Sequence, residues 1–143
     1  GTPTGLVPIE AIQPGMLVLA RDEANPQAPI VQRRVLETFV THPTRLRHLT
    51  VQAADGRTDT FSGTPNHPFY SYRHGGFVEA AELAVGDTLS LTDGKSAKVT
   101  SVCDETALPG RPFTTYNFAV AEHHTYFVGE SGIWVHNTGN LCE

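Results

Sequence analysis

Glycine and proline are so frequent in this chain that long regular elements have little room to form. The 143 residues include 13 glycines and 10 prolines, and both residue types interrupt helices and mark turns. Between them lie short runs rich in β-branched and aromatic residues, a pattern typical of strands. We therefore expect an all-β domain of many short strands, in a chain long enough to bury a core of its own.

The boundaries of the predicted strands follow from these turns. Asp55-Gly56 and Asp93-Gly94 are hairpin signals. Helical signals are weak and predict only a turn or two, at residues 8–12 and 78–83. The predicted strands are residues 16–21, 30–41, 46–53, 57–62, 69–72, 88–92, 97–103, 114–120, 126–129 and 132–136.

Charge and cysteine content exclude several functional classes. Ten basic and 15 acidic residues give a formal charge of −5, and without a basic stripe we expect no nucleic-acid partner. No apolar run approaches the roughly 18–20 residues of a membrane span, so no membrane partner is expected. Cys103 and Cys142 form no CxxC motif, and neither a disulfide nor an oligomeric state follows from the sequence. Cys103 ends a strand-like run and is expected to be a small buried side chain.

A weak internal repeat is visible. The segment 78–89 resembles the segment 7–18, each with an apolar turn, a glycine and then a strand. This predicts two interlocked halves around a pseudo-twofold axis, each delivering one histidine near the shared centre. The aligned pairs are Ile12 with Leu83, Gly15 with Gly86, and His67 with His136.

The dipeptide His136-Asn137 has the chemistry of a self-cleaving junction. An asparagine side-chain amide can attack its own main-chain carbonyl, close a succinimide and break the bond to the next residue, here Thr138. The amide is a poor nucleophile, so cleavage needs an imidazole to donate or accept protons. The alternative is that His136 and Asn137 only end a strand and begin a turn.

A second pair, Thr64 and His67, lies in the run 63–69. A short turn there would place the hydroxyl and the imidazole beside one peptide bond, whereas the alternative is a proline-rich loop with a satisfied histidine. The seven histidines show no spacing of a structural zinc site, so we expect neither a metal nor a cofactor. A third hypothesis, a zinc-binding module, stays open. Opportunistic binding of zinc by His67, His124 and His136 also stays open.

The runs 63–69, 122–128 and 132–138 occur together, in this order and near the appropriate spacing. In this combination the chain resembles the hedgehog/intein (Hint) family of self-processing domains, and more narrowly the Hint domains that precede the toxin in bacterial polymorphic toxins. The resemblance covers about residues 2–137. It implies a β-rich horseshoe of two pseudo-twofold-related halves with short helical turns, the architecture that the repeat also predicts.

The resemblance also implies roles at the C-terminal junction. Asn137 would cyclise and break its bond to Thr138. His136 would assist at the scissile carbonyl or at the leaving nitrogen, and His124 would orient or deprotonate the Asn137 amide. Thr138 would be the first residue of the released segment rather than a hydroxyl that receives an acyl group.

At the N-terminal junction, the resemblance implies that His67 and Thr64 bind and strain a scissile bond and that His67 protonates its leaving nitrogen. Asn117 stands where many relatives have aspartate; an amide does not titrate, so only a hydrogen-bonding role is expected. The family's initial cysteine or serine nucleophile has no counterpart at Gly1, and Thr2 aligns beyond the first strand of the family. We therefore expect no splicing.

Together these observations predict a Hint domain at residues 1–137 that lacks its first strand, followed by the start of a C-terminal passenger at 138–143. The domain would act once on its own chain rather than turn over, and its partner would be that passenger, an effector within an exported bacterial toxin precursor. The alternative is a non-catalytic β-rich domain that serves as a spacer or packs against a toxin. Trp134, Tyr126, Phe127 and Tyr116 are expected to be core residues.

Overall fold

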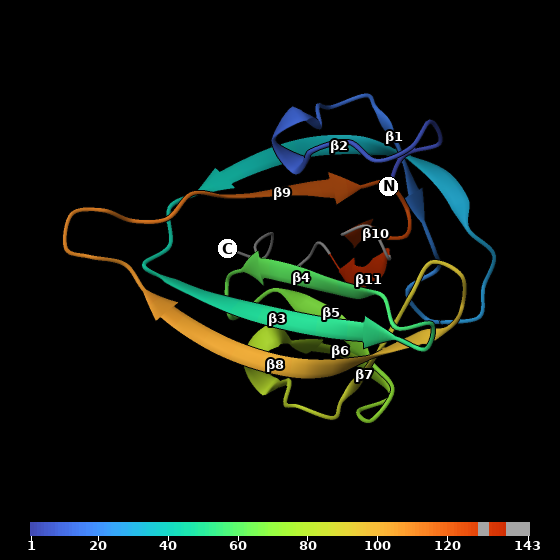
Figure 1. Cartoon of the computed structure of the whole chain (residues 1–143). Helices are drawn as coiled ribbons and strands as arrows, with labels where there is room; N and C mark the ends of the chain where they lie inside the picture. The colour runs from blue at the N-terminus through green and yellow to red at the C-terminus, as the bar shows by residue number, and fades with distance from the viewer. Residues whose placement is uncertain (129–131, 137–143) are drawn as a thin grey trace.

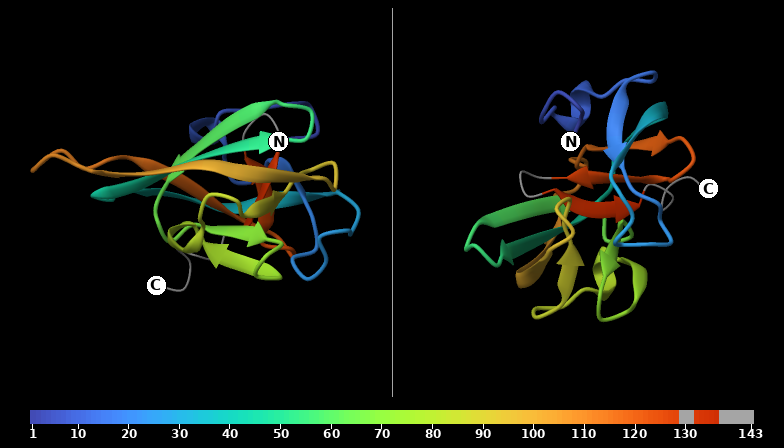
Figure 2. Two further views of the ribbon diagram at one scale, coloured as in Figure 1. Left: turned by 60° about the horizontal axis from the view of Figure 1, so that its bottom comes forward. Right: turned by 90° about the vertical axis from the view of Figure 1, so that its right-hand side faces the viewer.

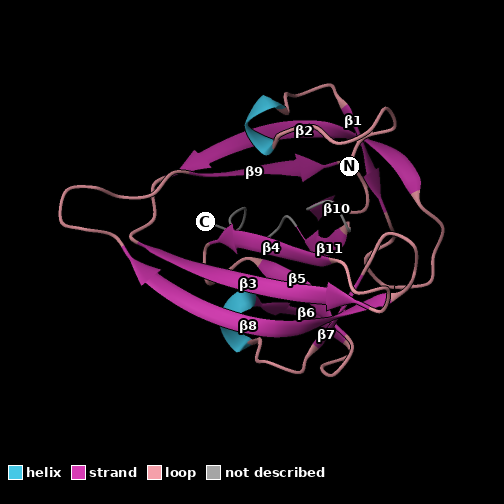
Figure 3. Ribbon diagram, in the orientation of Figure 1, coloured by secondary structure: helices cyan, strands magenta, loops and turns pink. Residues whose placement is uncertain are grey.

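The computed structural model describes residues 1–128 and 132–136, and strands are the main regular structure within them (Figure 1). Two short 3₁₀ turns are the only helical elements of this described part (Figure 3), and none of its helices is long and apolar enough to cross a membrane. The elements are η1 (Ile9–Ala11), β1 (Leu17–Ala20), β2 (Val31–Thr41), β3 (Arg45–Ala53), β4 (Thr58–Gly63), β5 (Pro68–Ser71), β6 (Gly76–Glu79), η2 (Ala80–Glu82), β7 (Thr88–Ser90), β8 (Ser96–Thr106), β9 (Thr115–Val120), β10 (Thr125–Val128) and β11 (Ile133–His136).

The strands form two sheets. One has the order β1-β2-β9, and the other has the order β10-β11-β5-β7-β8-β3-β4, with β6 paired to β5. The long strands of the first half of the chain pair with long strands of the second half. β2 pairs with β9 and β3 pairs with β8, both antiparallel. These strands run together toward one side of the molecule, where the β8–β9 loop extends furthest (Figure 2). The predicted all-β class, built from two interlocked halves, is confirmed.

The internal repeat has a structural counterpart. The turns η1 and η2 lie on opposite sides of the molecule (Figure 3), and each leads into a glycine with a left-handed backbone, φ +92° at Gly15 and +100° at Gly86. Both glycines donate their N–H to the neighbouring long strand, to the carbonyls of Val35 and Val99, at 2.8 and 2.9 Å. A β-carbon is disfavoured at such φ values, which explains why glycine occupies the same place in both copies.

Most buried apolar side chains form one core, and a smaller aromatic cluster lies beside it. The smaller cluster consists of Tyr70, Phe127 and Trp134. Successive residues of a strand face opposite sides, so β10 and β11 contribute side chains to the core and to the cluster. Tyr126 and Val135 lie in the main core, while Phe127 and Trp134 lie in the smaller cluster. These two strands therefore lie between the two apolar layers.

Three expectations from the sequence were wrong in detail. Residues 78–83 are not one helical turn, because β6 pairs with β5 through Glu79 and only η2 follows. Cys103 is exposed rather than buried: Val102 packs against the core, so its neighbour on the strand faces away. Tyr116 is 37% exposed, near the outer end of β9, where it pairs with Val40 of β2, another exposed residue.

Candidate active site

The residues singled out from the sequence gather around β5, β10 and β11. His67 directly precedes β5, His124 directly precedes β10, and His136 ends β11. These strands are neighbours, since β11 pairs with β10 on one side and with β5 on the other. Asn137 and Thr138, the predicted scissile pair, lie outside the described residues.

His67 is buried and belongs to a chain of hydrogen bonds. Its Nε2 lies 3.2 Å from the hydroxyl oxygen of Tyr126, and that hydroxyl donates to Oδ1 of Asn117 at 2.7 Å. The backbone N–H of Phe118 also donates to Asn117 Oδ1, at 2.8 Å. Because the tyrosine proton is directed at Asn117, the hydroxyl oxygen accepts from Nε2–H of His67. The neutral ring then carries its lone pair on Nδ1.

The surroundings of His67 are largely aromatic. The rings of Phe61, Phe69 and Tyr126 lie with centroids 5.2, 5.5 and 6.3 Å from the imidazole. Burial, with a smaller contribution from the charge of His136, lowers the pKa of His67 to about 4, against the opposing effect of a backbone hydrogen bond at Pro68. Burial also raises the pKa of Tyr126. At neutral pH, His67 is therefore uncharged, and the Tyr126 hydroxyl keeps its proton.

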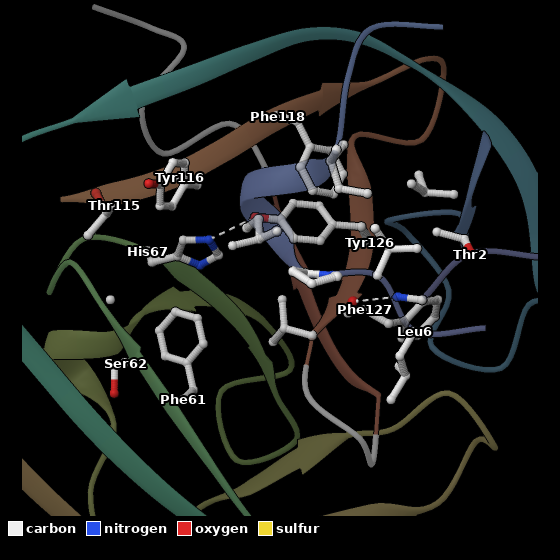
Figure 4. Close-up of a pocket in the computed structure, with 18 of the residues that line it drawn as sticks. Thr2, Leu6, Phe61, Ser62, His67, Thr115, Tyr116, Phe118, Tyr126 and Phe127 are labelled. Carbon is white, nitrogen blue, oxygen red and sulfur yellow. Dashed lines mark hydrogen bonds between the residues drawn. The ribbon is translucent and has the colours of Figure 1, made fainter. Parts of the chain in front are cut away.

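A cavity of about 610 Å³ opens beside this hydrogen-bonded chain. Thr64 and His67 line it together, as the sequence motif predicts, and the main-chain carbonyl of Thr64 accepts from the N–H of His67 at 3.1 Å. Figure 4 shows His67 and Tyr126 on one wall and Phe61 below them. The N-terminal amine of Gly1 lies at the same cavity and donates to the carbonyl of Phe127 at 3.0 Å.

The neutral state of His67 predicts a dependence of stability on pH. A histidine in the unfolded chain has a pKa near 6.5, above the folded value of about 4, so protons bind preferentially to the unfolded chain below pH 6.5. The stability contributed by His67 is complete above pH 6.5 and falls as the pH drops toward 4. We expect a loss of about 2 kcal/mol between pH 7 and pH 5.

Urea unfolding of the wild type and of His67→Gln at several pH values between 7 and 5 measures this contribution, in a range where most carboxylates stay ionised. The pH dependence should be weaker in His67→Gln and unchanged in His42→Gln, which removes an exposed histidine. Equal slopes in the wild type and His67→Gln would contradict the prediction.

The second group of site residues surrounds His136, which is buried at the end of β11. The ring of His136 packs against Phe77 at 4.9 Å, and the ring of His124 lies 6.3 Å away at an interplanar angle of 31°. His124 has a left-handed backbone, with φ +56°. Such a conformation is costly for a residue with a β-carbon and is often found at functional sites.

Two residues of this region were not identified from the sequence. Tyr126 was expected only as a core residue, yet its hydroxyl joins His67 to Asn117. Glu23 was not considered at all, and its carboxylate contacts Nε2 of His136. A hydroxyl within a buried strand is a signal for the first. No sequence signal pointed to Glu23, because Glu23 and His136 are far apart in the sequence.

Among the described residues, no group of three or more histidine, cysteine or acidic side chains is placed to hold a metal ion. The arrangement instead offers general acid–base groups: a neutral imidazole beside a cavity, and a pair of imidazoles at the end of β11. These groups suit chemistry on a peptide bond.

Comparison with known proteins agrees with this description. The chain is similar to a bacterial intein-like domain from Clostridium thermocellum, with 39% identity, a TM-score of 0.83, and coverage of 95% of this chain and 91% of that one. The gp41-1 intein shares the fold at 20% identity, with a TM-score of 0.68 over 95% of this chain and 91% of that one. A DnaB intein from Synechocystis does so at 20% identity and a TM-score of 0.66, over 92% and 86%.

No curated protein matches the chain. The model of the pretoxin HINT domain, in contrast, matches residues 1–138, almost the full length. The resemblance drawn from the motifs is thereby confirmed, and the chain belongs to the pretoxin Hint domain family.

Proposed function

We propose that this domain cleaves its own chain after Asn137 and releases the segment that begins with Thr138. The observation that carries the proposal is the pair of imidazoles, His124 and His136, whose rings lie 6.3 Å apart at the end of β11. Asn137 is bonded directly to His136. Membership in the pretoxin Hint family and the similarity to an intein-like domain support the same activity.

In the proposed reaction, Nδ2 of Asn137 attacks the main-chain carbonyl carbon of the same residue. His124 takes a proton from the attacking amide, and His136 delivers a proton to the nitrogen of Thr138. The bond between Asn137 and Thr138 breaks, which leaves a C-terminal succinimide on the domain and a free amine on the released segment. A positioned imidazole contributes about 10²–10⁴ in rate to such steps.

The experiment is to express the chain with a C-terminal reporter domain and to follow intact masses over time. The expected products are a reporter that begins at Thr138 and a domain that ends at residue 137 and is one water lighter than its hydrolysed form. Cleavage at another bond would contradict the mechanism. A chain that stays intact for days would favour the alternative, a β-rich spacer that packs against the passenger.

His124 allows a specific test of the proton-accepting role. We expect His124→Asn to slow cleavage by about a hundredfold, because asparagine tolerates the left-handed backbone of this position but cannot accept the proton. Unfolding by urea should show little change in stability. The matched control is Glu122→Asn, since Glu122 also has a left-handed backbone, with φ +66°, and is exposed. Equal rates for both variants would refute the role of His124.

The biological role proposed for this cleavage is the release of a C-terminal effector, as the pretoxin family suggests. Splicing is not part of the proposal. The cavity beside Thr64 and His67 is the proposed place for the N-terminal junction. His67 is neutral there at pH 7, so it would need to gain a proton before it could protonate a leaving nitrogen.

A further inference from the structure

We propose that Glu23 is a positioning residue for the cleavage, and that it holds the imidazole of His136 in one orientation and one tautomer. This inference rests on the proposed function. Its basis is the contact between Oε2 of Glu23 and Nε2 of His136, which joins the turn after β1 to the end of β11.

Hydrogen bonds connect the segment just before the Glu23 turn to β10, one of the strands of the site. The backbone N–H of Arg21 donates to the Thr125 hydroxyl oxygen at 3.1 Å, and that hydroxyl donates to the Arg21 carbonyl at 2.6 Å. Thr125 is the residue of β10 that pairs with His136 across the ladder. The strand partner of His136 thus holds the backbone two residues before Glu23.

The side chain of Arg21 fixes the same segment from within. Its guanidinium lies over the rings of Trp134 and Phe127, at 4.9 and 5.3 Å from their centroids. It also donates to Ser90 Oγ and to the carbonyls of Leu91 and Thr92, at 2.9 to 3.1 Å. Beyond Arg21 the chain turns sharply, with the N–H of Ala24 donating to Asp22 Oδ1 at 3.0 Å. Glu23 therefore projects from a fixed turn.

The chemistry of the contact specifies a tautomer. An ionised carboxylate only accepts hydrogen bonds, so Nε2 of His136 must carry a proton. The contact thus distinguishes the two ring nitrogens of His136. A fixed hydrogen bond at one ring nitrogen is a common way to orient a functional histidine.

His48 and Glu105 provide a comparison within the same chain. Their Nε2–Oε1 distance is 2.9 Å, and the side chain of His48 is only partly buried, 29% exposed, while that of Glu105 is 53% exposed. In the Glu23–His136 pair the histidine side chain is only 9% exposed and packs against Phe77. Because the ring of His136 is buried, it cannot turn freely, and the carboxylate of Glu23, although 43% exposed, can thereby select which ring nitrogen carries the proton.

The test compares cleavage rates of Glu23→Ala, Glu23→Gln and the control Glu105→Ala. We expect Glu23→Ala to cleave at least about tenfold more slowly. Glu23→Gln keeps an acceptor oxygen for Nε2–H and should stay within about threefold of the wild type, as should Glu105→Ala. A wild-type rate in Glu23→Ala, or equal losses in the alanine and glutamine variants, would overturn positioning through this hydrogen bond.

A measurement that needs no cleavage separates this inference from the proposed function. In the Asn137→Ala background, ¹⁵N NMR of the His136 ring near neutral pH should show a protonated Nε2, and the added change Glu23→Ala should shift the ring toward a mixture of tautomers. An unchanged pattern would overturn the inference even if the domain cleaves. If the wild type does not cleave, the proposed function fails, and the NMR result still decides the contact.

Discussion

Replacing Asn137 with alanine is expected to abolish release of the C-terminal segment. The proposed nucleophile is Nδ2 of Asn137, and alanine has no atom that can close a ring on its own carbonyl. The histidines cannot compensate, because in this mechanism they only move protons. The measurement is intact mass of the reporter fusion over days, in which the variant should remain whole while the wild type separates into two products.

The chain offers a matched control in Asn140, a second asparagine close to the junction. Asn140→Ala should cleave at the wild-type rate, because this residue is not adjacent to His136. Cleavage of Asn137→Ala at the same bond would sink the cyclisation mechanism and point to attack by water or another side chain. Unfolding curves of both variants should match the wild type.

The second large effect is expected on stability. We predict that Arg21→Ala lowers the free energy of unfolding by about 3–5 kcal/mol, a large share of the roughly 5–15 kcal/mol typical of a domain. The side chain is 2% exposed. Its loss leaves a void between Trp134 and Phe127 and removes the guanidinium donor to the Thr92 carbonyl and one of two donors to the Leu91 carbonyl, which keeps the N–H of Gly94.

Urea unfolding of three variants separates these contributions. Arg21→Met keeps a long side chain between the two rings but loses the donors, so it should lie between the wild type and Arg21→Ala. Arg57→Ala is the control: its side chain is 58% exposed and pairs with an equally exposed Asp55, and such pairs contribute little. A change below about 1 kcal/mol in Arg21→Ala would contradict the prediction.

The sequence predicted the repeat and the strands of the described part except β6, because both depend on local signals. Turn residues and alternating side chains mark where a strand begins, and Gly15 and Gly86 mark the same turn in both halves. The prediction that Cys103 is buried was wrong, because the partner strand decides which face of a strand packs against the core. Here that face is set by the register of β8 against β3.

The site was only partly predictable for the same reason. The motifs singled out His67, His124 and His136 as candidates, and the structure places them on or beside the neighbouring strands β5, β10 and β11. The contacts of His67 with Tyr126 and of His136 with Glu23 join residues that only the completed fold brings together. No local pattern encodes a contact between a turn near residue 23 and the end of β11.

The position of β11 sets the order of events during synthesis. This strand, the last of the described part, enters between β10 and β5 and pairs with both. The ribosome has therefore made every other described strand before His136 can take its place. The proposed cleavage after Asn137 would therefore have to wait until the domain is complete, and a chain that ends before β11 would not cleave.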